Sequence, residues 1–423
     1  MRGRASCGFA TTAVVAMTTP HDPYAPFRHR DFRRFIAMVL IASLCQQSLG
    51  VAVGWDIYER TGSAMALGWV GLAQFIPVLL FFLPAGQLAD RHDRRRIVAV
   101  SLTIWVAASA LLVFSAWRSL PVISIYVALT AIGMSTVLNR AGRDALLSQM
   151  VPAPALARAV MWNSTVFQTA SVAGPALAGL LIGLGGSAIT VYWFNLAGML
   201  VAMALALSIH KHPLVAGKRP STWGDVFGGL AHVWRTKVVL GLITIDLFAV
   251  LLGGATALLP IYAKDILQVG ATGLGWLAAA PAIGAVGVAV VHARAKPHAH
   301  AGRAFLWAVA VFGLATLVFG LSRWYWLSFI ALVVVGAADN VGAVIRQTAV
   351  QLYTPDELRG RVAAVNRVFI SSSNELGAVE SGLLASLTNP VFTVAAGGVV
   401  VLLIAATGFR VFPDLRRLRT VGV

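Results

Sequence analysis

The chain has 423 residues, of which 58% are hydrophobic and 12% are charged, against about 25% charged in soluble domains. Its mean hydropathy of +0.80 excludes a water-soluble enzyme, and an outer-membrane barrel would show weaker, alternating hydropathy. The net charge of +17 would suit a nucleic-acid partner only if the basic residues were clustered on one soluble surface.

If a spanning helix takes roughly 20 residues, the apolar stretches of this chain predict twelve spans. They run over 35–57, 64–87, 97–116, 121–141, 157–184, 188–209, 238–260, 271–292, 303–321, 324–345, 363–387 and 390–411. The expected fold class is an all-α membrane protein with two six-helix bundles. Its predicted parts are an N-terminal tail (1–33), an N-terminal bundle (34–210), a linker (211–237), a C-terminal bundle (238–411) and a C-terminal tail (412–423).

Basic residues are distributed very unevenly over the predicted loops. All but four of the 33 lysines and arginines fall on the side that carries both termini and the linker. The exceptions are Arg60, Arg118, Lys264 and Arg323. Because cytoplasmic loops carry the excess of positive charge, this bias predicts a multi-pass protein of the cell inner membrane with both termini in the cytoplasm. The expected partner of the charged loops is the lipid bilayer, and no nucleic acid.

The two halves of the chain resemble each other at an offset of 203 residues. The offset pairs Pro152 with Pro355, Arg143 with Arg346, Asn163 with Asn366 and Gly133 with Gly336. Each half holds an even number of spans, so both copies begin on the same side and the repeat is parallel. Two parallel-repeat bundles related by an axis along the membrane normal are a transporter architecture.

The loop between the second and third spans reads Gly86-Gln-Leu-Ala-Asp90-Arg91-His-Asp-Arg94-Arg95-Arg96. It resembles the cytoplasmic signature of the major facilitator superfamily, G-x-L-x-D-R-x-G-R-R, with Asp93 in place of the second glycine. The resemblance implies the twelve-helix fold of that superfamily and a conformational latch formed by Gly86, Asp90, Arg91, Arg94 and Arg95. The alternative is a basic loop that only sets topology.

The fifth span contains Gly174-Pro175-Ala-Leu-Ala178-Gly179. This segment resembles the G-P-x-x-G-G portion of the antiporter motif of facilitator-superfamily exporters, with Ala178 in place of one glycine. Small residues permit close packing of helices, and Pro175 removes a backbone hydrogen bond. The antiporter-type motif therefore consists of Gly174, Pro175 and Gly179, and the alternative is an ordinary kinked packing helix.

Three motifs together make residues 28–410 similar to the enterobactin-exporter and macrolide-efflux-like family: residues 28–33, 86–96 and 354–361. The resemblance implies alternating-access export of an amphipathic small molecule, a siderophore or a drug, in exchange for protons. The alternatives are a lipid or lysolipid flippase and a non-transporting receptor or scaffold. The sequence has no Ser/His/Asp, Cys/His or metal-ligand cluster, so we expect no enzyme, metal or cofactor. We expect a monomer driven by the proton gradient.

Ionisable residues inside a membrane are expensive and mark functional sites. The candidates for proton coupling are Asp246, Glu375, Glu380 and Asp56. The alternative for these acids is an interhelical ion pair, for example of Asp339 with Arg346 or Arg367, and Asp339 is assigned a structural role. Polar and aromatic residues at midplane depth are the candidates for the substrate cavity: Gln46, Gln47, Gln74, Trp162, Asn163, Gln168, Asn195, Phe248, Phe369 and Asn374.

Overall fold

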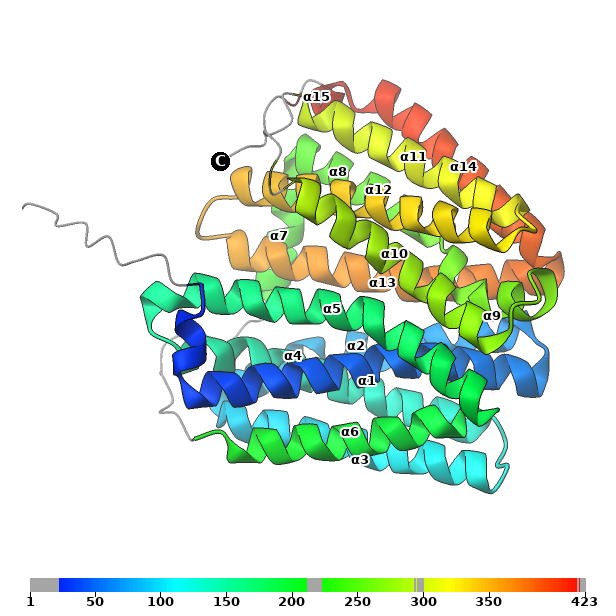
Figure 1. Cartoon of the computed structure of the whole chain (residues 1–423). Helices are drawn as coiled ribbons and strands as arrows, with labels where there is room; N and C mark the ends of the chain where they lie inside the picture. The colour runs from blue at the N-terminus through cyan, green and yellow to red at the C-terminus, as the bar shows by residue number, and fades with distance from the viewer. Residues whose placement is uncertain (1–22, 211–222, 293, 295–299, 417, 419–423) are drawn as a thin grey trace, which may run out of the picture.

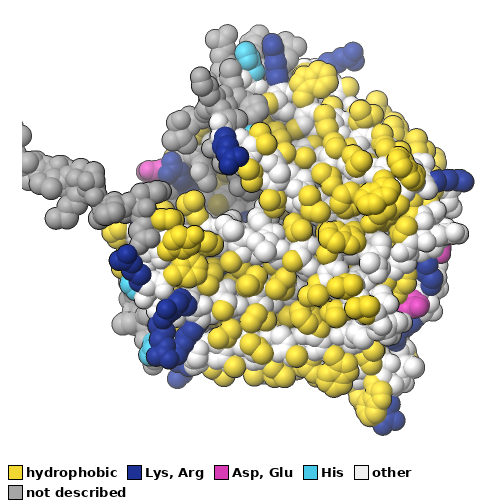
Figure 2. Space-filling model, in the orientation of Figure 1, with side chains coloured by type: hydrophobic (Ala, Val, Ile, Leu, Met, Phe, Trp, Pro, Cys, Tyr) yellow, Lys and Arg dark blue, Asp and Glu magenta, His cyan; other side chains and the backbone are white. Residues whose placement is uncertain are grey.

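The computed structural model describes residues 23–210, 223–292, 294, 300–416 and 418. These residues form helices and no strand. Figure 1 shows two stacked layers of long helices, one formed by α1 to α6 and the other by the helices that follow. Among the described residues, 11 helical segments are long and apolar enough to cross a membrane. Figure 2 shows hydrophobic side chains over the middle of one face and most lysines and arginines toward its margins.

The N-terminal half begins with a short turn, η1 (Ala25–Arg28), followed by six long helices. These are α1 (Arg30–Thr61), α2 (Ala64–Arg91), α3 (Arg94–Trp117), α4 (Ile123–Met150), α5 (Ala153–Gly185) and α6 (Ile189–Ser208). α1 and α5 each end at a glycine with a left-handed φ, 60° at Gly62 and 69° at Gly186, a conformation that favours glycine. The predicted spans of this half therefore coincide with helices.

The C-terminal half begins with α7 (Trp223–Arg235), which lies within the predicted linker. The long helices that follow are α8 (Lys237–Leu252), α10 (Gly270–His292), α11 (Ala301–Leu321), α12 (Tyr325–Leu352), α13 (Arg359–Leu387) and α14 (Pro390–Val411), and a short α15 (Pro413–Arg416) follows them. α13 corresponds to the predicted span 363–387 and is more polar than the apolar segments. It packs against α2 and α8, so protein covers much of its surface.

The predicted span over 238–260 is confirmed as part of an apolar segment, Lys237–Ile266, long enough to cross a membrane. It is not one helix, because α8 stops before Gly253 and Gly254. The chain continues as η2 (Ala255–Leu258), α9 (Leu259–Ile261) and η3 (Tyr262–Ile266). Paired glycines are poor helix formers. The break leaves the Gly254 carbonyl free to accept a 3.2 Å hydrogen bond from the Ser381 hydroxyl on α13. Broken helices of this kind occur in membrane proteins where neighbouring protein satisfies the freed backbone groups.

Equivalent helices of the two halves pack in the same way. α4 crosses α2 at Gly133, where an added Cβ would lie 2.7 Å from the carbonyl oxygen of Gln74. α12 crosses α10 at Gly336, the repeat partner of Gly133, where an added Cβ would collide with Pro281. We call the end of the molecule where α1 and α8 begin and α6 and α14 end the arginine-rich end, and the other the opposite end.

Candidate functional site

The two halves meet through small residues on α5 and α10, which lie side by side in Figure 1. A Cβ added to Gly179 would lie 2.8 Å from Gly275 Cα, and one added to Gly275 would lie 2.6 Å from the carbonyl oxygen of Pro175. Gly174 faces α1 instead, where an added Cβ would lie 2.6 Å from Gln47 Cβ. Gly174 and Gly179 thus lie at helix contacts that leave no room for a side chain, and the Pro175 carbonyl lies at the contact with Gly275.

A second contact between the halves joins α2 to α13. A Cβ added to Gly382 would lie 2.8 Å from Gly68 Cα. Close by, the Tyr58 hydroxyl on α1 donates a hydrogen bond to Asp265 in η3. Sequence analysis did not single out Tyr58 or Asp265, because neither lies in a recognisable motif and their elements are far apart in the chain.

At the arginine-rich end, the two halves contact each other less closely than at these glycines. Asp144 on α4 and Arg367 on α13 form an ion pair with 3.9 Å between oxygen and nitrogen, and both side chains are more than half exposed. Exposed pairs contribute only about 0–1 kcal/mol. Among the described residues, each glycine that touches the other half lies in the part of its helix nearer the opposite end.

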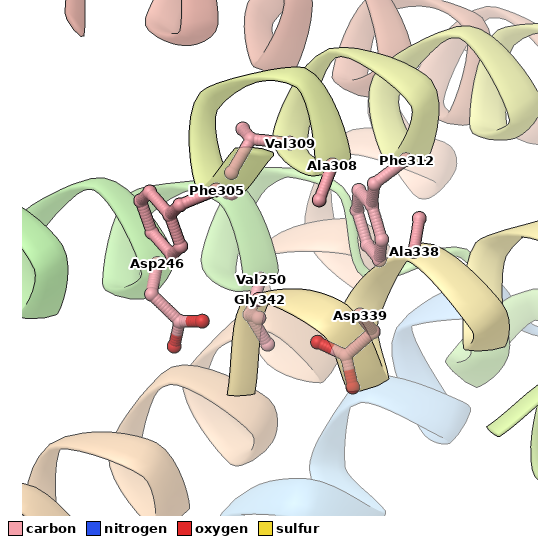
Figure 3. Close-up of a pocket in the computed structure, with 10 residues that line it drawn as sticks. Asp246, Val250, Phe305, Ala308, Val309, Phe312, Ala338, Asp339 and Gly342 are labelled. Carbon is pink, nitrogen blue, oxygen red and sulfur yellow. The ribbon is translucent and has the colours of Figure 1, made fainter. Parts of the chain in front are cut away.

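A buried charge cluster lies inside the C-terminal half. Asp246 on α8 and Arg346 on α12 are 9% and 5% exposed and form an ion pair. Asp246 and Asp339 line a cavity of about 20 Å³, which has room for one water molecule. Figure 3 shows the two carboxylates on neighbouring helices beside this cavity, with Phe305 and Phe312 contributed by α11. The cavity thus has two carboxylates in its lining, one of them paired with Arg346.

The predicted pairing of Asp339 with Arg346 or Arg367 is wrong. Arg346 pairs with Asp246, and Arg367 pairs with Asp144. The internal repeat pairs Arg346 with Arg143 and so drew attention to Arg346. No local sequence pattern indicated that its ion-pair partner, Asp246, would come from α8.

Glu375 lies where α13 contacts α2, and a Cβ added to Gly71 would lie 3.3 Å from its Oε2. Its carboxylate is therefore placed at a boundary between the two halves. Glu380, farther along α13, lies 3.4 Å from the Ser381 hydroxyl, which can donate its one hydrogen either to this carboxylate or to the Gly254 carbonyl at the break that follows α8. Both candidates thus lie near contacts that a movement of one half against the other would change.

Asp56 and Asn195 are bonded inside the N-terminal half. Asp56 accepts hydrogen bonds from Arg60 Nε at 2.7 Å and from the Tyr192 hydroxyl at 2.8 Å. Asn195 is fully buried, accepts a 2.8 Å bond from the Ser109 hydroxyl and donates to a carbonyl oxygen of α1. A cavity-lining role for Asn195 is therefore corrected to one in helix packing.

The aromatic candidates for the cavity also pack within their own halves. Trp162 donates to the carbonyl oxygen of Pro23 at 3.0 Å, and its ring meets Phe27 edge-on at 5.0 Å. Phe248 lines a groove between α8 and α14, and Phe369 packs on an apolar cluster of the C-terminal half. Each of these contacts lies within one half, so the lining of a space between the halves by the three rings stays a prediction.

Asn163 and its repeat counterpart Asn366 have buried amide oxygens without a hydrogen-bond partner among the described residues. An unsatisfied buried acceptor costs about 1–3 kcal/mol, so each oxygen is available to a donor from water or a ligand. Gln47, by contrast, donates to the Ser171 hydroxyl at 3.0 Å. The other amide candidates are exposed or half-buried: Gln46, Gln74, Gln168 and Asn374.

The predicted latch is described only in part, because the side chains of Asp90 and Arg91 lie outside the described residues. Asp93, which replaces the glycine of the signature, caps α3 by accepting a 3.0 Å hydrogen bond from the Arg95 backbone N–H. The Arg95 guanidinium donates to the carbonyl oxygen of Leu207 at the end of α6. The departure from the signature thus has a structural role at the start of α3.

A family model of transmembrane secretion effectors, in the major facilitator superfamily, matches residues 21–418. The enterobactin exporter EntS of Shigella flexneri is 25% identical over 402 residues, covering 93% of each chain. EntS of Escherichia coli O81 (strain ED1a) is 25% identical over 400 residues with the same coverage.

Two solved transporters have similar structures. A bacterial homologue of the human lysosomal transporter Spinster, inward-facing and unoccupied, has a TM-score of 0.69 and 16% identity, covering 91% of this chain and 98% of that one. The peptide transporter POT in complex with sulfate has a TM-score of 0.72 and 12% identity, covering 92% and 96%. At these identities the likeness shows the fold, and it confirms the predicted fold class.

Proposed function

Because this chain belongs to the transmembrane secretion effector family of the major facilitator superfamily, we propose that it exports an amphipathic small molecule across the cell inner membrane in exchange for protons. The substrate class is a siderophore or a drug, and the enterobactin exporters at 25% identity support the siderophore. Transport occurs by alternating access, in which the two halves rock about a site between them.

The uneven contact between the two halves carries this proposal. Backbones touch at Gly179 and Gly275 and at Gly68 and Gly382, all near the opposite end. Contacts between glycines separate without leaving polar groups unpaired, which suits a gate. This arrangement supports a state closed at the opposite end and open toward the arginine-rich end, which we assign to the cytoplasm from the distribution of basic residues.

Proton coupling requires a carboxylate whose surroundings change between the two states. Glu375 meets this requirement best, because its carboxylate lies at the contact of α13 with Gly71 on α2. Separating these helices would admit water to the carboxylate, and an ionised carboxylate is far more stable in water than in an apolar contact. Asp246 could take part only if its ion pair with Arg346 opened, and Asp339 is a second carboxylate at the same cavity.

Transport by the full chain in proteoliposomes tests the proposal, with enterobactin as the siderophore probe and ethidium as the drug probe. Glu375→Gln should abolish accumulation driven by a pH gradient and leave downhill exchange intact, because an amide carries no proton. Glu357→Gln, at an exposed acid in the turn before α13, is the matched control. Uphill transport by Glu375→Gln at the wild-type rate would exclude coupling through Glu375.

The same vesicles separate the alternatives. A lipid flippase would move a fluorescent lysophospholipid and neither probe, and a receptor or scaffold would move none of the three. Movement of either probe by the wild type, and its loss in empty vesicles, would support the exporter.

A further inference from the structure

A groove of about 250 Å³ runs between α8 and α14 on the surface of the C-terminal half. Its lining is apolar apart from two threonines, and three of its side chains, Phe248, Leu403 and Val411, are 44%, 60% and 60% exposed. Since both helices belong to membrane-spanning segments, these side chains face hydrocarbon. The groove reaches Val411 and Phe412 at the arginine-rich end.

Basic residues surround this end of the groove. Lys237 begins α8 and Arg410 lies in the last turn of α14; both are exposed and neither forms a salt bridge among the described residues. The two helices are close here, because a Cβ added to Gly241 would lie 3.0 Å from the ring of Phe412. Trp234, 65% exposed just before α8, is the type of residue found at the level of lipid headgroups.

The N-terminal half provides an internal comparison, because the offset of 203 relates α8 and α14 to α1 and α6. Arg34, the counterpart of Lys237, donates to the carbonyl oxygen of Ser208, the counterpart of Val411. A polar contact within the protein therefore closes the arginine-rich end of the α1–α6 seam. The C-terminal half has a basic residue, Lys237, at the same place. There the Phe412 ring lies close to Gly241, and among the described residues no hydrogen bond joins Lys237 to α14.

We propose that the α8–α14 groove binds one acyl chain of an anionic phospholipid, whose phosphate is held by Lys237 and Arg410. The apolar walls match a hydrocarbon chain, and two unpaired cations at headgroup depth match a phosphate. The lipid completes the seam in the C-terminal half, where Arg34 completes the corresponding seam in the N-terminal half. This site is separate from the contacts between the halves that carry the proposed transport.

Native mass spectrometry of the full chain released from nanodiscs tests this site, with phosphatidylglycerol as the probe in a phosphatidylcholine bilayer. A basic residue near an anionic lipid surface contributes about fivefold in affinity. The double variant Lys237→Gln/Arg410→Gln should therefore lower phosphatidylglycerol retention by roughly 25-fold. Arg30→Gln, an exposed arginine at the start of α1, is the matched control beside the closed seam and should retain the lipid.

A second variant tests the groove without altering charge. Thr407→Phe fills the groove from α14 and should displace the acyl chain, so phosphatidylglycerol retention should fall while Lys237 and Arg410 remain. Its melting temperature in lipid-free detergent should equal that of the wild type. Equal retention of phosphatidylcholine and phosphatidylglycerol by the wild type, or unchanged retention in Thr407→Phe, would overturn the proposal, whether or not the double variant folds.

Discussion

The Tyr58 hydroxyl on α1 donates a hydrogen bond to Asp265 in η3 and so ties the two halves together at the opposite end. Lys264 reinforces this contact, since its ammonium lies 5.8 Å from the Tyr58 ring centroid and 5.9 Å from that of Trp55. All of these partners lie on the side where the chain carries few basic residues. If the opposite end opens during transport, this bond has to break.

Tyr58→Phe should therefore favour the state open at the opposite end by about 1.5–3 kcal/mol, since a hydrogen bond to a carboxylate is lost. The distance between spin labels at Gly62 and Gln268, measured by double electron–electron resonance, should shift toward longer values. Tyr126→Phe is the control, because it removes a 2.8 Å bond to the Ala66 carbonyl within the N-terminal half. Identical distance distributions in Tyr58→Phe and the wild type would contradict a gating role.

Gly179→Val should prevent closure at the opposite end, because even a Cβ at this position would lie 2.8 Å from Gly275 Cα. Transport of either probe should fall at least tenfold while the helix content is unchanged. Gly50→Val is the matched control, since an added Cβ on Gly50 of α1 meets nothing within 4 Å. Equal transport rates for the two variants would show that closure does not need the α5–α10 contact.

Asp246→Leu should lower the free energy of unfolding by about 3–5 kcal/mol, because it leaves Arg346 buried without its partner. The double variant Asp246→Leu/Arg346→Met should recover most of that loss, since no unpaired charge remains. Thermal unfolding in detergent measures both effects. A loss below about 1 kcal/mol for the single variant would mean that Asp339 pairs with Arg346 when Asp246 is absent.

Asp90→Asn and Asp93→Ala should separate two roles of the loop between α2 and α3. Asp90→Asn keeps the size and removes the charge, so a charge-dependent latch should slow transport at normal expression. Asp93→Ala removes the cap of α3 and should lower stability by about 0.5–2 kcal/mol. Transport assays measure the first effect and thermal unfolding the second. Transport by Asp90→Asn at the wild-type rate would mean that the loop sets topology and does not act as a latch.

Labelling of single cysteines with a membrane-impermeant maleimide checks the orientation. With Cys7 and Cys45 replaced by serine, cysteines at Gly62, Ser119 and Arg323 should react from outside the cell, and one at Arg94 should react only after lysis. These positions follow the side assigned from the distribution of basic residues. Reaction at Arg94 in intact cells would reverse the assignment.

The sequence by itself determined the fold class, because each span must satisfy its own backbone and present apolar side chains over the full thickness of a bilayer. Both requirements are local, so hydropathy predicted even the span 363–387, although Glu375 and Glu380 lie within it. The glycine and proline residues at 174–179 were also recognised locally, and close packing is what such residues permit.

Only the tertiary structure decided which residues meet. Arg346 pairs with Asp246 and not Asp339, Asn195 is bonded within its own half, and α8 ends at Gly253 where Ser381 can bond the free carbonyl of the next residue. These outcomes depend on the rotation and crossing of helices distant in sequence. In a bilayer, lipid and protein interior are both apolar, so the pattern of apolar residues along a span does not reveal which face turns toward which neighbour.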